Sequence, residues 1–119
     1  MLRSPQASGL ARLATRETLV SWQLAHLVDT AILLVSELVG NALQHARSNG
    51  TSPELRLEAT QARLRIEVHD ADPRPPQLCL PGDLDEAGRG LMLVEAFAAK
   101  WGVRETKTGK AVWAEMDTE

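Results

Sequence analysis

The segment Ser36–Ala46, SELVGNALQHA, has a carboxylate and a carboxamide four residues apart in an otherwise apolar stretch. In a helix, Glu37 and Asn41 would lie on one face, about 6 Å apart along the axis. A carboxylate in that position can orient a water molecule or accept a hydroxyl proton. The carbonyl oxygen of Asn41 is a ligand type that Mg²⁺ prefers. A solvated helix edge is the alternative interpretation of both residues.

Asp70 is a second candidate, because it stands where an alternating, strand-like segment ends. An Asp at a strand end commonly starts a turn through a hydrogen bond from its side chain. Alternatively, its carboxylate would accept a hydrogen bond from an exocyclic amine, such as that of adenine, at a pocket mouth. Asp72 completes a D-x-D pattern, which is too short to indicate a site by itself.

The segment 88–94, GRGLMLV, is the third candidate. Gly88 and Gly90 precede an apolar, helix-like repeat, and glycines there let backbone N–H groups approach an anion closely. A helix-initiating turn with flexible glycines is the alternative. The dinucleotide pattern G-x-G-x-x-G is excluded because Leu93 occupies the third glycine position, and the Walker phosphate-binding pattern is not met either.

Two helices are predicted in the first part of the chain. The first precedes all three motifs, and the second contains the segment Ser36–Ala46. Pro5 fits the first position of a helix, where its missing N–H costs nothing, so a helix is expected from about Pro5 to Trp22. A second helix, from about Leu27 to Ala46, has a wider apolar stripe and is expected to be deeply packed. The first stripe consists of Leu10, Leu13, Glu17 and Val20, and the second of Leu27, Ala31, Leu34, Leu38 and Ala42.

The rest of the chain predicts a sheet, a long loop and a third helix. Apolar residues alternate over 55–58 and 64–69, which indicates two antiparallel strands. The Pro-rich segment that follows is too long for an ordinary loop, and such loops are commonly functional or disordered. A helix is expected from about Gly90 to Lys100, followed by a hairpin over 102–116 with Gly109 in or beside its turn. The inward residues of this helix would be Leu91, Val94, Phe97 and Trp101.

This order of elements predicts an α+β fold, a two-layer sandwich in which three helices cover one face of an antiparallel or mixed sheet. The 119 residues are expected to form one domain, 1–119. The net charge of −3 argues against direct, sequence-independent nucleic-acid binding. The single cysteine excludes an internal disulfide, and no apolar run approaches the roughly 20 residues of a membrane span. A cytoplasmic protein is expected.

In this order and spacing, the motifs resemble the ATP-binding domain of the gyrase, chaperone, histidine-kinase and mismatch-repair superfamily. The likeness is strongest to the bacterial anti-sigma-factor serine/threonine kinases and their actinobacterial relatives. SELVGNALQHA resembles the N box, HDADP the first glycine box and GRGLMLV the second, and the likeness extends over about residues 5–116.

The resemblance implies a role for each motif residue. Glu37 matches the general base or water-orienting carboxylate, and Asn41 the Mg²⁺ ligand that ties the metal to the ATP phosphates. Asp70 matches the acid that binds the adenine amino group. The turn that wraps the phosphates, under a mobile lid formed by the Pro-rich loop, would consist of Gly88, Arg89, Gly90 and Leu91.

The chain departs from the family pattern at three places. The first glycine box, usually D-x-G-x-G, reads Asp70-Ala71-Asp72-Pro73-Arg74, which places Asp72 as a second carboxylate near the adenine. Ala111 stands where many relatives have Thr. The first helix is expected almost at the first residue, where relatives commonly have an extra strand. A sheet edge is therefore expected to be short or exposed, where a partner subunit could cover it.

Three functions remain open at this point. The first is a Mg-ATP-dependent transferase that phosphorylates a serine or threonine of a partner protein, namely an anti-sigma antagonist, and so regulates transcription. The second is a module that binds a sigma factor or an antagonist in an ATP-dependent way without turnover. The third is a scaffold that no longer binds nucleotide. A homodimer is expected from family likeness alone, and no membrane partner is expected.

Overall fold

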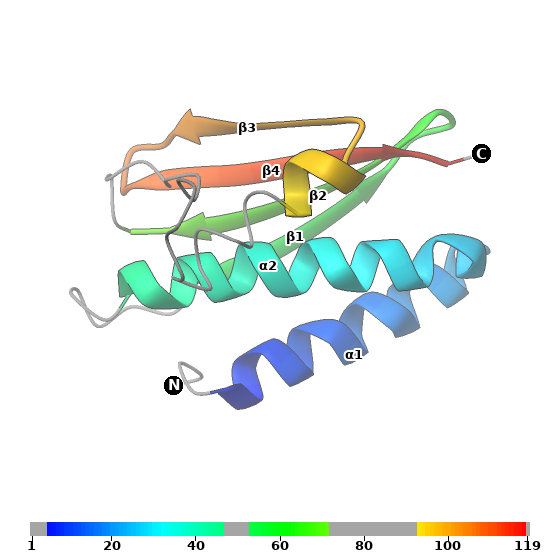
Figure 1. The fold of residues 1–119 in the computed structure, drawn as a ribbon, viewed down its shortest axis with the longest axis horizontal. Coiled ribbons are helices and arrows are strands. Elements are labelled where there is room, and N and C mark those ends of the chain that lie inside the picture. Colours follow the sequence, from blue (N-terminus) through cyan, green and yellow to red (C-terminus); the bar gives the residue numbers. More distant parts are fainter. Residues whose placement is uncertain (1–4, 47–52, 72–92, 119) are drawn as a thin grey trace.

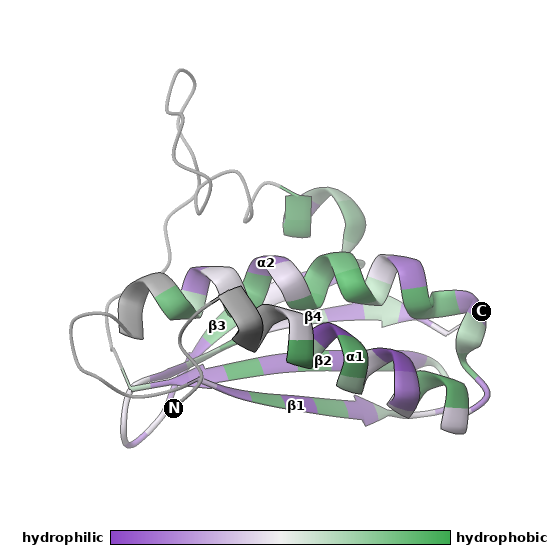
Figure 2. Cartoon of the chain, turned by 90° about the horizontal axis from the view of Figure 1, so that it is seen from below, coloured by the Kyte–Doolittle hydropathy of each residue, from purple (hydrophilic) through white to green (hydrophobic). Residues whose placement is uncertain are grey.

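The computed structural model describes residues 5–46, 53–71 and 93–118. The fold is α+β, with a four-stranded sheet in one layer and helices in the other (Figure 1). Seen from a second direction, the helices lie on one side of the sheet (Figure 2), which confirms the predicted two-layer architecture. The elements are α1 (Pro5–Ser21), the 3₁₀ turn η1 (Ala25–Leu27), α2 (Val28–Ala46), β1 (Glu54–Ala59), β2 (Arg63–Asp70), β3 (Lys100–Glu105) and β4 (Lys110–Asp117).

The sheet is antiparallel throughout, with the strand order β1-β2-β4-β3. The first two strands form one hairpin and the last two form the other, as the alternation in the sequence predicts. The two hairpins meet through β2 and β4, whose register pairs Arg63 with Asp117 and Asp70 with Lys110. Asp70 and Lys110, which are 40 residues apart in the sequence, therefore become neighbours at the end of β2 and the start of β4.

The period of two in β2 places every second side chain in the core. Leu64, Ile66 and Val68 are all 1% exposed or less, and Asp70 continues this row at the end of the strand. On β4, Val112 belongs to the same core as these residues. The intervening residues of both strands lie on the opposite face of the sheet.

Helix α2 is the central element of the helical layer, packing against β2 on one side and α1 on the other (Figure 1). The segment Ala25–Leu43 is long and apolar enough to cross a membrane by length and composition alone. The prediction that no apolar stretch approaches this length is therefore corrected. The place of α2 between α1 and the sheet accounts for the apolar composition. The buried apolar side chains of α2 are Val28, Ala31, Leu34, Val35, Leu38, Val39 and Ala42, and Leu27 of η1 continues them.

The predicted apolar stripe of α1 is not its buried face. Leu10, Leu13 and Val20 are each at least half exposed, and Glu17 is exposed as well. The helix instead packs through residues spaced by four, whose small members allow a close approach to α2. These are Ala11, Thr15 and Leu19.

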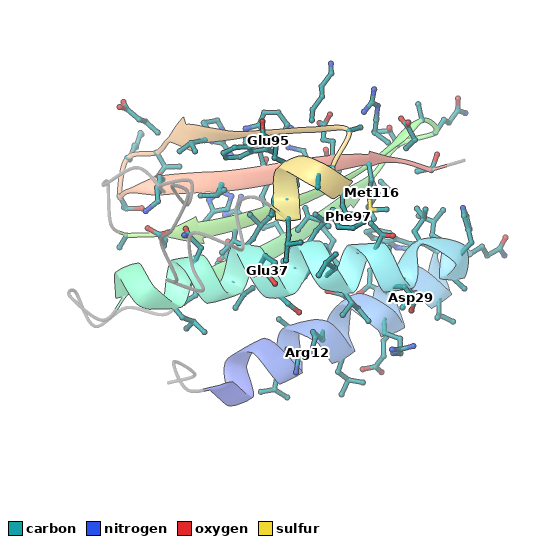
Figure 3. The ribbon with its side chains drawn as sticks, viewed as in Figure 1. Arg12, Asp29, Glu37, Glu95, Phe97 and Met116 are labelled. Carbon is teal, nitrogen blue, oxygen red and sulfur yellow. The ribbon has the colours of Figure 1, made fainter. Side chains whose placement is uncertain are left out.

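The C-terminal end of the third helix was predicted wrongly. Helical residues extend over 93–97, and β3 already begins at Lys100. Val94 is buried as expected, but Phe97 is 52% exposed (Figure 3). Trp101 does reach the core, although it does so from β3 rather than from the helix. The helical spacing of these apolar residues was therefore misleading, since the last one belongs to a strand.

Candidate nucleotide-binding site

The described residues include three of the predicted site residues. Glu37 and Asn41 lie on α2, and Asp70 lies at the end of β2, the strand against which α2 packs. Asp72 and the segment 88–91 (Gly88, Arg89, Gly90 and Leu91) lie outside the described residues. Their predicted roles in binding the base and the phosphates stay predictions.

Asn41 is a buried polar residue at the border of the apolar face of α2. It is 4% exposed, and within the described part of the chain its Oδ1 accepts no hydrogen bond. Leaving a buried carbonyl oxygen without a partner costs about 1–3 kcal/mol, so each such atom in a folded protein needs an explanation. A bound cation is a direct one, because a carboxamide oxygen is a suitable ligand for Mg²⁺.

Glu37 is half-buried on α2 (Figure 3) and lies one helical turn before Asn41 in the sequence of that helix. On the helical wheel, Gly40 lies to one side of Glu37 and Asn41 to the other. A Cβ atom added to Gly40 would have none of the described atoms within 4 Å. On this side, α2 therefore combines a carboxylate and a carboxamide with a glycine that no described side chain approaches.

Asp70 is buried and ion-paired, a feature that sequence analysis missed. The Nζ atom of Lys110 lies 3.1 Å from Asp70 Oδ1, and both side chains are 1% exposed. The pair joins the end of β2 to the start of β4. Asp70 is therefore tied to the sheet by a charged hydrogen bond, which a turn-starting Asp would not need.

Gly109 allows the two strands to come this close. A Cβ atom at this position would overlap with the carbonyl oxygen of Asp70 and would lie 2.6 Å from the carbonyl carbon of Ala71. A backbone hydrogen bond from Thr106 N to Gly109 O, 3.0 Å long, closes the hairpin turn just before it. The predicted place of Gly109 in the turn is confirmed. Glycine is needed there because any side chain would clash with the backbone at the end of β2.

A second charged cluster lies on the other face of the sheet and is separate from this site. Glu67 accepts hydrogen bonds from Arg65 at 2.6 Å, His69 at 2.8 Å and Arg104 at 3.0 Å. Burial by itself would raise the pKa of the Glu67 carboxyl, but the hydrogen bonds from Arg65 and His69 and the two arginine charges lower that pKa to about 2. Arg65 also stacks on Trp113, 4.3 Å from the ring centroid.

The donor set near Asn41 fits a cation that shares its ligands with a nucleotide. Among the described residues there is no group of three or more His, Cys, Asp or Glu side chains that could hold a metal ion. Mg²⁺ commonly takes only one or two protein ligands and completes its shell with phosphate oxygens and water. A single carboxamide oxygen is therefore enough for Mg²⁺ bound together with ATP.

Comparison with known proteins identifies the fold family. Residues 4–116 match the histidine kinase-like ATPase domain. The chain belongs to this family. It is also 38% identical over 85 residues to an uncharacterized protein of Streptomyces coelicolor, a match that covers 68% of this chain and 79% of the relative. Membership in this family implies that the domain binds ATP, in agreement with the predicted nucleotide.

Proposed function

We propose that this histidine kinase-like domain is a Mg-ATP-dependent serine/threonine protein kinase of the anti-sigma-factor type. The observation that supports it best is the buried Oδ1 of Asn41, which has no hydrogen-bond partner in the described part of the chain, one turn from the Glu37 carboxylate. A metal ligand and a proton acceptor side by side are what phosphoryl transfer requires of a protein.

In this proposal each residue has a separate task. Mg-ATP, when bound, supplies the γ-phosphoryl group and much of the charge neutralisation. Asn41 would hold the metal, Glu37 would accept the proton of the attacking hydroxyl, and Asp70 would bind the base amine. The packing of α2 on both sides keeps the first two side chains in a fixed relation, which is the main contribution positioning can make.

The phosphoryl acceptor would be a separate protein. The buried faces of α1, α2 and the sheet are occupied by the core of this domain itself. A sigma factor or an anti-sigma antagonist in the cytoplasm is the proposed partner, with a serine or threonine hydroxyl as acceptor.

The first test is calorimetric titration of the purified protein with ATP, with and without Mg²⁺, repeated for Asn41→Ala and Asp70→Asn. The proposal expects micromolar-to-millimolar binding by the wild type, strengthened by Mg²⁺. Asn41→Ala should lose the Mg²⁺ enhancement, and Asp70→Asn should lose affinity for the base. Absence of binding by the wild type at millimolar ATP would leave only the scaffold function.

An ATP-dependent binding module without turnover is the second candidate. The altered first glycine box, where Ala71-Asp72-Pro73-Arg74 replaces the usual glycine positions, favours it. Transfer of labelled phosphate to candidate partner proteins, with Glu37→Ala as the control, separates the two. A kinase loses transfer in Glu37→Ala but keeps ATP binding, whereas a binding module shows no transfer in either protein.

A further inference from the structure

The buried pair of Asp70 and Lys110 needs a reason beyond stability. Both side chains are 1% exposed, and their charged atoms lie 3.1 Å apart. Taking two charges out of water costs free energy that the attraction between them often fails to recover, so an apolar pair of similar volume commonly serves a fold as well. The pair is therefore better explained by what it holds in place.

Three features of this end of the sheet fix the position of the Asp70 carboxylate. Lys110 donates a charged hydrogen bond to Oδ1, and Asp70 and Lys110 are direct partners in the register of β2 and β4. Gly109 has no side chain, so the start of β4 can lie against the backbone of Asp70 and Ala71. A carboxylate can accept about four hydrogen bonds, so a bond from Lys110 is compatible with one from a ligand.

We infer that Lys110 is a positioning residue for base recognition: it holds the Asp70 carboxylate in the place where that group accepts a hydrogen bond from the amino group of adenine. This inference rests on the proposed nucleotide site. Lys110 acts through Asp70 and makes no contact with the nucleotide of its own. It therefore sets the preference for a purine that has a 6-amino group, and leaves the phosphates and Mg²⁺ to other residues.

The test compares ATP with purine riboside triphosphate, which lacks the 6-amino group and is otherwise the same. Affinities of both are measured by calorimetry for the wild type and for Lys110→Met. We expect Lys110→Met to bind ATP about tenfold more weakly, while its affinity for the analogue stays within about twofold of the wild type. Equal losses for both nucleotides would assign Lys110 to phosphate binding or to folding alone and would overturn the inference.

A second comparison covers the case in which Lys110→Met fails to fold, since it leaves a buried carboxylate without its cation. The double variant Asp70→Asn, Lys110→Met has no buried charge at either position. If Lys110 acts only through Asp70, the double variant binds ATP as Asp70→Asn does; a further loss contradicts the inference. Lys107→Met, an exposed lysine in the β3–β4 turn, is the matched control and should leave both affinities unchanged.

The two proposals fail in different ways. If the wild type binds neither nucleotide, the proposed function falls, and the inference about Lys110 falls with it. If the wild type binds ATP and Lys110→Met shows the same preference for ATP over the analogue, only the inference falls.

Discussion

At the scale of single residues, the candidate site contains buried polar and charged side chains that lower the stability of the fold. Asn41 places a buried carbonyl oxygen at the border of the apolar face of α2, where within the described residues nothing donates a hydrogen bond to it. Polar groups that cost free energy in the fold often persist because the ligand needs them. The same reasoning applies to the buried charges of Asp70 and Lys110.

Replacing Asn41 with Leu, which has a similar volume, is therefore expected to stabilise the protein while it removes the metal ligand. The free energy of unfolding should rise by about 1 kcal/mol, because a buried oxygen without a partner is lost. Urea denaturation measures this change, and titration with Mg-ATP should show the loss of binding. A variant that is less stable than the wild type would indicate that the Asn41 side chain supports the fold.

At the scale of elements, glycines have opposite roles in α2 and β3. A Cβ atom at Gly40 in α2 would meet no other described side chain within 4 Å, whereas one at Gly102 would come within 2.8 Å of the Trp113 ring. In the first case the glycine costs helix stability, and in the second it gives Trp113 the room in which it stacks with Arg65.

Gly40→Ala and Gly102→Ala should thus shift stability in opposite directions. Alanine at 40 should stabilise the apo protein by about 0.5–1 kcal/mol, because glycine is the poorer helix former. Alanine at 102 should destabilise it by about 1–3 kcal/mol, since the Trp113 ring has to move. Thermal and urea unfolding of the two variants, which differ from the wild type by one methyl group each, provide the comparison.

At the scale of the whole molecule, the sheet face opposite the helices responds to acid through Glu67. Two arginines and a histidine from β2 and β3 surround this carboxylate, and its pKa is about 2 instead of the usual 4.5. A folded-state pKa below the unfolded value means that the stabilisation is fully present above pH 4.5. It is lost as the pH falls from there towards 2.

Glu67→Gln should therefore be less stable than the wild type at neutral pH, by about 1–3 kcal/mol, because solvent screens part of this partly exposed cluster. The difference should shrink between pH 4.5 and pH 2, as the wild-type carboxyl becomes protonated. Urea denaturation at a series of pH values measures it, with Glu58→Gln on the exposed side of β1 as the control. A difference that stays constant down to pH 2 would contradict the assigned pKa.

The sequence allowed the prediction of the parts of the fold that depend on local periodicity. The long apolar face of α2 and the two hairpins were predicted because side-chain spacing alone determines which face is buried. The buried face of α1 was predicted wrongly, because the small residues Ala11 and Thr15 pack in line with Leu19. The larger residues of the predicted stripe are exposed instead. The end of the third helix was misplaced because Trp101 continues a helical spacing although it belongs to β3.

The candidate site was predictable in its types of residue but not in its connections. Glu37, Asn41 and Asp70 were each recognised from local motifs. Lys110 was missed because its role depends on the pairing of β2 with β4, and no local pattern indicates which strands of two hairpins become neighbours. Gly109 was placed in a turn correctly, but its contact with the backbone of Asp70 depends on the same pairing.

The central pairing of β2 with β4 also has a consequence for the order of folding. Helices α1 and α2 and each hairpin bring together residues that are close in the sequence, whereas Asp70 and Lys110 are 40 residues apart. Contacts across longer loops form more slowly, because more chain entropy is lost before they contribute. During synthesis, the carboxylate that we propose to bind the base therefore cannot gain its Lys110 partner until β4 has left the ribosome.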